Sequence, residues 1–191
     1  MPDFTFELEP FDNQAHHGYR GVAGPYGEAM VFYVKPLGPV RPNQMMRVEL
    51  VGEHLPETRI EGIGARGQPS THKARIEIAG TPGTLSYNSL GMTRAARALT
   101  IGYAGRQYAF TYLKRLAGDK ELTRPGVRIV TKEGGLLEGV GSGRHFTVHG
   151  DADETDLAIA IALQSVDTTP LMPGVAVVSA FLRSSANSAG G

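Results

Sequence analysis

Short segments in which apolar and polar residues alternate dominate the first 150 residues of the chain. Phe4, Phe6 and Leu8 are separated by polar residues, and this period of two is typical of strands with one buried face. Further strands are expected at 30–34, 46–50, 60–63, 74–78 and 84–87. Turns that contain glycine or proline separate them, so the chain is predicted to be mostly β.

Two later segments read as hairpins. The first covers residues 98–114 and turns at Ala104-Gly105. The second covers residues 127–149 and is expected to turn through either 134–135 or 141–143, because each stretch is rich in glycine.

The second strand of the first hairpin carries an aromatic stripe. Tyr108, Phe110 and Tyr112 share one face with Arg106 and Lys114. Such a stripe either packs into a core or, when exposed, stacks nucleic-acid bases. The core is favoured here, so nucleic acid is not an expected partner.

The pattern changes at Asp151. Acidic residues precede the apolar run 157–163, and Asp153 with Asp156 resembles a pair of helix-capping residues. A strand with the larger apolar side chains on one face is the alternative, but the alanines favour a helix over 153–166. Because that helix is apolar on all sides, strands should enclose it.

These elements predict a mostly β fold. We expect a closed or nearly closed antiparallel β-barrel or sandwich, with the apolar helix near the C-terminus plugging or capping it. Residues 1–183 should form one domain, with a further buried segment at 175–182, and residues 184–191 should form a flexible tail.

Composition narrows the function classes. The chain has no cysteine, which excludes disulfides, thiolate catalysis and Cys-ligated metals. Residues 1–10 lack the features of a signal peptide, and the run 157–163 is too short to span a bilayer. A cytoplasmic location is therefore expected.

Charge is spread unevenly along a chain of zero net charge. Residues 90–150 hold ten basic and four acidic residues, a net of +6. These residues are either ordinary solvated side chains or part of a surface that attracts anions. The candidate ligand-binding residues on the second interpretation are Arg94, Arg97, Arg115, Arg124 and Arg128.

No catalytic or metal motif is complete. His145 and His149 would lie about 13 Å apart on a strand, too far for one zinc ion. His16-His17 is expected to be an exposed loop pair. No nucleophile elbow or general acid–base pair is recognisable, so no catalytic residue, metal or cofactor is predicted. Whether the protein is an enzyme stays open, with a non-enzymatic role favoured.

The C-terminal half resembles a known family. The hairpin at 99–113, the strands at 127–148 and the helix at 153–166 are similar to the tubby C-terminal-like superfamily, in particular its LURP-one-like and scramblase-like members. The resemblance covers residues 96–183 and is closest over 151–163. It implies a twelve-stranded barrel around a central hydrophobic helix and, as in tubby, basic side chains that bind phosphoinositide head groups. It assigns no individual residue to that role.

Three functions follow as hypotheses. The leading one is a non-enzymatic barrel that binds an anionic partner, such as a lipid head group or a phosphate-bearing ligand, through the basic segment. The second is a small-molecule-binding or enzymatic barrel whose pocket is lined by Tyr103, Tyr108 and Tyr112. The third is a structural subunit that assembles through its sheet edges. The oligomeric state stays open.

Overall fold

The computed structural model describes residues 3–39, 41, 43–65, 67–88, 91, 93, 95–113 and 118–172. The predicted segment 175–182 and tail 184–191 lie outside these residues.

Thirteen strands form one antiparallel sheet among the described residues. In chain order they are β1 (Phe4–Asp12), β2 (His16–Val22), β3 (Glu28–Val34), β4 (Met45–Gly52), β5 (Thr58–Ala65), β6 (Gln68–Pro69), β7 (Arg75–Ile78), β8 (Thr81–Ser86), β9 (Leu99–Tyr103), β10 (Arg106–Tyr112), β11 (Lys120–Arg124), β12 (Val127–Leu137) and β13 (Gly141–Gly150). All the strands expected from the alternating pattern are present.

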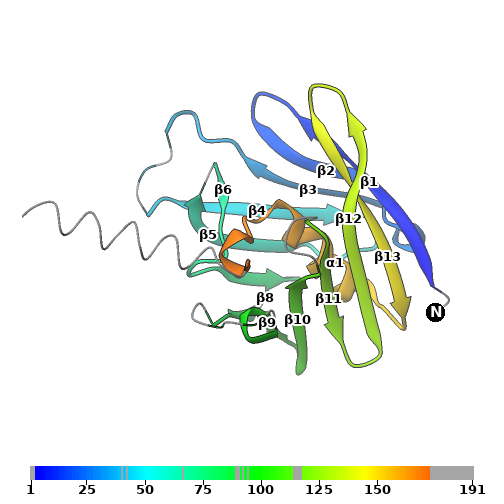
Figure 1. Cartoon of the computed structure of the whole chain (residues 1–191). Coiled ribbons are helices and arrows are strands. Elements are labelled where there is room, and N and C mark those ends of the chain that lie inside the picture. The colour runs from blue at the N-terminus through cyan, green and yellow to red at the C-terminus, as the bar shows by residue number, and fades with distance from the viewer. Residues whose placement is uncertain are drawn as a thin grey trace, which may run out of the picture.

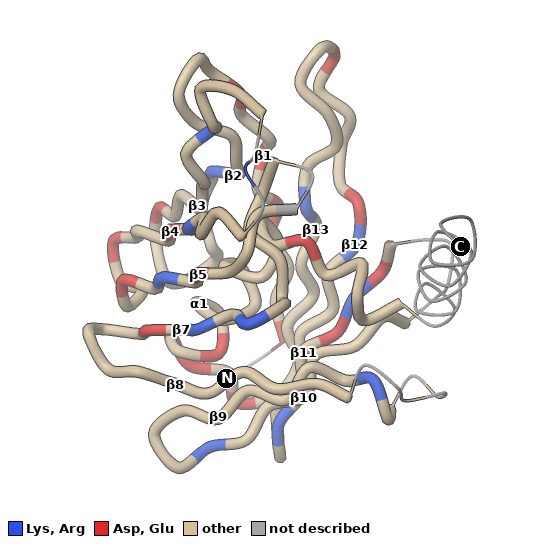
Figure 2. The backbone as a smooth tube through the Cα atoms, turned by 90° about the vertical axis from the view of Figure 1, so that its left-hand side faces the viewer, with Lys and Arg blue, Asp and Glu red and all other residues tan. Residues whose placement is uncertain are grey.

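The sheet closes on itself. β4 pairs with β5 as well as with β3, while β1 pairs with β13. The result is a closed ring of twelve strands, and the short β6 is attached to β5 outside the ring. Figure 1 shows the ring from the side, and Figure 2 looks into it. The predicted closed antiparallel barrel is confirmed.

One helix lies inside the ring. α1 (Glu154–Ala162) begins at Asp153, and a 3₁₀ turn continues it over Leu163–Ser165. Every side chain from Leu157 to Leu163 is at most 1% exposed. The predicted enclosed helix is therefore confirmed, and the strands surround it on all sides (Figure 2). A helix that is apolar all round is stable only in such surroundings.

The aromatic stripe belongs to the core. Tyr108, Phe110 and Tyr112 are 2%, 1% and 7% exposed. They point into the barrel because alternate residues of β10 face inward. The core interpretation of the stripe is confirmed.

Both predicted hairpins are present, but the turn was placed correctly in only the first of them. β9 and β10 turn at Ala104-Gly105, both with positive φ (47° and 76°), as predicted. β12 and β13 turn at residues 138–140, so both predicted turn positions were wrong. Gly134 lies within β12, where a Cβ would stand 2.2 Å from the Glu7 carboxylate. Glycine serves there for close approach and not for chain reversal.

The prediction for His16-His17 was also wrong. These residues begin β2, where they pair with Val34 and Tyr33 of β3. Both are half-buried, and the His17 ring lies 5.4 Å from the Tyr33 ring. They contact neighbouring aromatic rings, and His17 Nδ1 also lies 3.4 Å from Asp12 Oδ2, contacts that the adjacent turn residues did not suggest.

Candidate functional site

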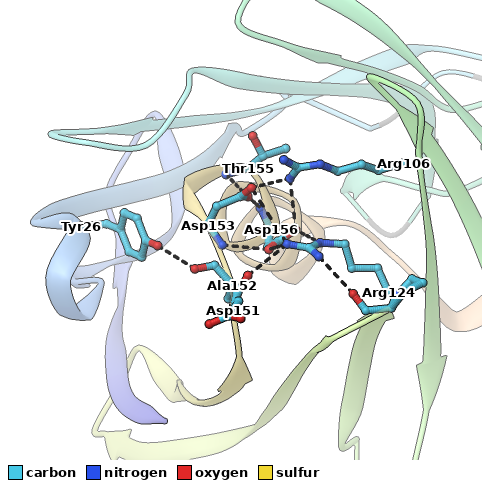
Figure 3. A network of polar contacts seen from close by, with 9 residues as sticks. Tyr26, Arg106, Arg124, Asp151, Ala152, Asp153, Thr155 and Asp156 are labelled. Atoms are coloured by element: carbon cyan, nitrogen blue, oxygen red, sulfur yellow. Dashed lines mark hydrogen bonds and ion pairs between the residues drawn. The ribbon is translucent and has the colours of Figure 1, made fainter. Parts of the chain in front are cut away.

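The N-terminal end of α1 is held by an ion-pair network (Figure 3). Asp153 accepts hydrogen bonds from the backbone amides of Thr155 and Asp156, while Asp156 accepts one from the amide of Asp153. Asp156 is fully buried and binds Arg124 through two hydrogen bonds, from Nε at 2.7 Å and from Nη2 at 2.6 Å. The predicted capping pair is confirmed, and Arg124 neutralises its buried member.

Neighbouring residues complete this network. Arg106 donates to the Asp153 carboxylate, and Tyr26 donates to the Ala152 carbonyl at 2.9 Å. Burial raises the pKa of Asp153, but hydrogen bonds from Arg106 and from the Asp156 amide outweigh that effect and leave the pKa below its usual value. The network anchors the enclosed helix to β10, β11 and the segment after β2, so its role is structural.

The described candidate arginines do not form one basic face. Arg97 is 4% exposed and donates to the Met172 carbonyl at 2.7 Å, and Arg124 belongs to the helix cap. Arg128 is exposed and pairs with Glu121 at 2.6 Å. Arg94 and Arg115 lie outside the described residues. In the part of the chain that is described, basic and acidic segments are interspersed around the ring (Figure 2).

A second polar group lies at the opposite end of α1, in the mouth of the barrel. On β11, Lys120 shares the inward face with Leu122 and Arg124, since alternate residues of a strand share a face. On β13, Arg144 shares the inward face with Phe146 and Val148. Each strand therefore places a cation inside the barrel, at the level of the C-terminal end of the helix.

Aromatic rings hold both mouth cations. Lys120 Nζ lies 5.7 Å from the centre of the Tyr112 ring, and the Arg144 guanidinium lies 4.7 Å from that of Tyr19. Such cation–π contacts stabilise a charge without neutralising it. Arg144 also donates to the carbonyls of Ser142 and Gly143.

Carboxylates face the mouth but do not pair with these cations. Glu133 lines the cavity, and Asp167 lies near enough to influence Lys120 electrostatically. Among the residues that the structure describes, no carboxylate oxygen lies within 4.0 Å of Lys120 Nζ or of an Arg144 nitrogen. The two positive charges are therefore available to a ligand.

The environment of Lys120 disfavours its charge. Burial, together with the positive charge of Arg144, lowers the pKa of Lys120 from its ordinary 10.5 to about 8, although Asp167 acts in the opposite direction. A desolvated ammonium regains stability when an anion approaches it. The site is thus prepared for a negative group.

The same mouth holds an unused hydrogen-bond acceptor. Gln164 is 5% exposed, and its Nε2 donates to the Ala160 carbonyl at 2.8 Å. Its Oε1 has no hydrogen-bond partner among the described residues, but this atom has almost no exposed surface. The Tyr112 hydroxyl is already bonded to Thr168 Oγ1 at 2.7 Å. Gln164 Oε1 therefore offers no contact to a ligand in the cavity.

These residues line a small cavity, the mouth pocket, defined by Lys120, Arg144, Tyr112, Thr131, Glu133 and Gln164. Its volume is about 190 Å³. Pockets for drug-sized molecules are larger, about 300–1,000 Å³. The mouth pocket therefore suits a small anion or the charged end of a larger molecule.

The sequence placed Lys120 and Arg144 in the basic segment but did not select them. The alternation on their strands was the available signal, because it groups each with inward-facing apolar residues. Of the three tyrosines proposed to line a pocket, Tyr112 lines the mouth pocket. Tyr108 fills the core, and Tyr103 donates to the Ile78 carbonyl at 3.0 Å.

The described residues contain no group of three or more His, Asp or Glu side chains able to hold a metal ion. None of their helices is long and apolar enough to cross a membrane. His149 is used locally, with Nδ1 2.6 Å from an Asp3 oxygen.

No family model, curated protein or solved structure matches the chain.

Proposed function

We propose that the protein is a non-enzymatic barrel that binds a small anionic group in the mouth pocket. The observation that carries this proposal is the presence of two inward-facing cations, Lys120 and Arg144, for which the described residues provide no carboxylate partner within 4.0 Å. An arginine fork and a lysine point charge together suit the geometry of a phosphate.

The proposal keeps the anionic partner expected from the basic segment but assigns it to different residues. A twelve-stranded barrel around one apolar helix also supports membership of the tubby C-terminal-like superfamily, and in tubby itself basic side chains bind phosphoinositide head groups. The phosphate-bearing ligand is then either a soluble phosphate monoester or a lipid head group.

Isothermal titration with glycerol phosphate tests the soluble source. We expect binding by the wild type and a loss of at least about tenfold in affinity in Lys120→Met and in Arg144→Met, since each removes a charge contact worth more than about 1.4 kcal/mol. Arg128→Met is the matched control, because it removes an exposed cation from the next strand. Equal affinity in all four proteins, or none in any, would refute the proposal for soluble phosphates.

Co-sedimentation with phosphatidylcholine vesicles, with and without phosphoinositide, tests the lipid source. Sedimentation that requires phosphoinositide and is lost in Lys120→Met would place the head group in the mouth pocket. Sedimentation that Lys120→Met and Arg144→Met leave unchanged would show that lipid binds elsewhere. The mouth pocket would then have no role in lipid binding.

A further inference from the structure

The outer surface of β1–β4 has a groove, which is separate from the mouth pocket. Four outward-facing residues form one row across these strands in direct register, because Glu9 pairs with Arg20, Arg20 with Met30, and Met30 with Val51. The groove around this row has a volume of about 910 Å³, several times that of the mouth pocket.

Two glycines allow the strands to pack closely beneath the groove. β1 pairs with β13 through Leu8 and with β2 from Glu9 onward, and Gly21 of β2 lies against the β1 backbone beside this change of partner. Gly21 has φ +154°, and a Cβ there would lie 2.9 Å from the Glu7 carbonyl oxygen. Gly52 is the second such position, with a Cβ only 3.1 Å from the Glu28 carbonyl oxygen. A Cβ at these positions would also approach the core side chains of Leu8 and Leu55, so the two glycines permit close packing between the groove and the core.

The groove combines an apolar floor with an acidic rim. Val22, Met30 and Val51 are 56%, 36% and 38% exposed, which makes them unusual on a barrel whose outer face is largely polar. The acidic rim residues are Glu7, Glu9, Glu28 and Glu53, and they come from β1, β3 and the end of β4.

One basic residue, Arg20, lies among these described lining residues. Its guanidinium carbon lies 5.8 Å from the centre of the Phe11 ring. Four carboxylates against one guanidinium give the groove a net charge of −3 on a chain of zero net charge. The local field therefore attracts cations.

We propose that this groove binds a short segment of a partner protein in which apolar side chains are flanked by lysine or arginine. Exposed methyl and thioether groups on the floor gain from burial against apolar side chains. The rim carboxylates match basic side chains in charge and, for arginine, in geometry. The ring of strands is closed, so recognition relies on side chains and not on strand addition.

A fluorescently labelled peptide of alternating lysine and leucine is a suitable probe, with fluorescence anisotropy as the readout on the full chain. Matched peptides replace either every lysine by glutamate or every leucine by serine. We expect the lysine–leucine peptide to bind best and its affinity to fall as salt rises, because exposed charges are screened. Equal binding of the glutamate peptide would overturn the proposal.

Variants locate the binding. Glu9→Gln/Glu28→Gln and Met30→Ser should each weaken the lysine–leucine peptide at least about tenfold. Glu138→Gln is the control, since it removes an exposed carboxylate at the β12–β13 turn, outside the groove. Equal weakening by the control, or none in the groove variants, would show that the peptide binds elsewhere. Self-association that Met30→Ser abolishes would show that a second copy of this chain occupies the groove instead.

Discussion

Lys120 and Arg124 stand on the same inward face of one strand, yet their surroundings give them opposite roles. Arg124 meets the buried carboxylate of Asp156 and is fully used in holding the helix. Lys120 meets a tyrosine ring and the positive charge of Arg144. A buried charge without a partner costs stability, and proteins retain such groups most often at functional sites.

The pH dependence of stability follows from Lys120. Because its pKa is about 8 in the folded protein and 10.5 in its ordinary state, the unfolded chain binds more protons between these values. The free energy of unfolding should therefore rise from pH 8 towards pH 9.5, and at neutral pH the site costs about 3 kcal/mol, at about 1.4 kcal/mol per pKa unit. Urea denaturation at a series of pH values measures this.

Lys120→Met is the control for the pH series. It removes the titrating amine while keeping an apolar stem of similar length, so the rise above pH 8 should disappear and stability at pH 7 should increase. A wild-type stability that stays flat or falls between pH 8 and 9.5, or an unchanged slope in Lys120→Met, would contradict the assignment.

Substitution of Phe110 measures how much the aromatic stripe contributes to the free energy of unfolding. Its ring is 1% exposed, and Phe110→Ala should lower the free energy of unfolding by about 3–5 kcal/mol, through lost burial and the cavity left behind. Chemical denaturation gives the value. Thr111→Ala, on the opposite face of β10, should cost far less, and a similar cost for both variants would contradict the core position of the ring.

At the scale of the element, the ion pair at the start of α1 should dominate the stability of the helix anchor. Arg124→Met removes both side-chain hydrogen bonds to the fully buried Asp156 carboxylate and leaves it only the longer ion pair with Arg106, at 3.8 Å. Losses of about 3–5 kcal/mol are typical when one partner of a buried pair is removed. The double variant Arg124→Met/Asp156→Asn should recover part of this loss, which a double-mutant cycle on unfolding free energies measures.

Arg128→Met provides the comparison on the outer face of the barrel. The Arg128–Glu121 pair is exposed, so its loss should cost no more than about 1 kcal/mol. Equal costs for Arg124→Met and Arg128→Met would contradict a structural role for Arg124. They would return it to the candidates for ligand binding.

Elements with a clear period were predictable from sequence, and features set by distant contacts were not. The alternation on β1 and β10 and the acidic start of α1 are local signals, and the structure matches all three. The position of the β12–β13 turn was predicted wrongly because Gly134 makes room for the side chain of Glu7, a residue far away in sequence. The ion pair between Arg124 and Asp156 could likewise not be predicted from the sequence, because the two side chains meet only once the helix lies inside the barrel.

At the scale of the whole molecule, closure explains why the described part of the basic segment forms no single basic face. Six of its basic residues lie on four consecutive strands of the ring, β10–β13, whose side chains alternate between the interior and the surface. The barrel interior receives the side chains of Arg124, Lys120 and Arg144. Arg128 lies on the outer surface, where it pairs with Glu121. A run of charge along the sequence is thus divided between two faces, and only the pairing of the strands decides which charges meet.

The closed ring also makes the barrel and its helix one cooperative unit. α1 contributes side chains on every face to a core shared with β1, β4, β5, β10 and β13.

Ile161→Asp places a charge at a fully buried position and should lower the free energy of unfolding by about 3 kcal/mol or more. Because the ring depends on the helix to fill it, far-UV circular dichroism and tyrosine fluorescence should report one coincident transition at a lower denaturant concentration. Ile161→Val, the conservative control, should cost only about 0.5–1.5 kcal/mol. Separate transitions in Ile161→Asp, with the strands unfolding at the wild-type midpoint, would show that the ring is stable without its helix and would refute the shared core.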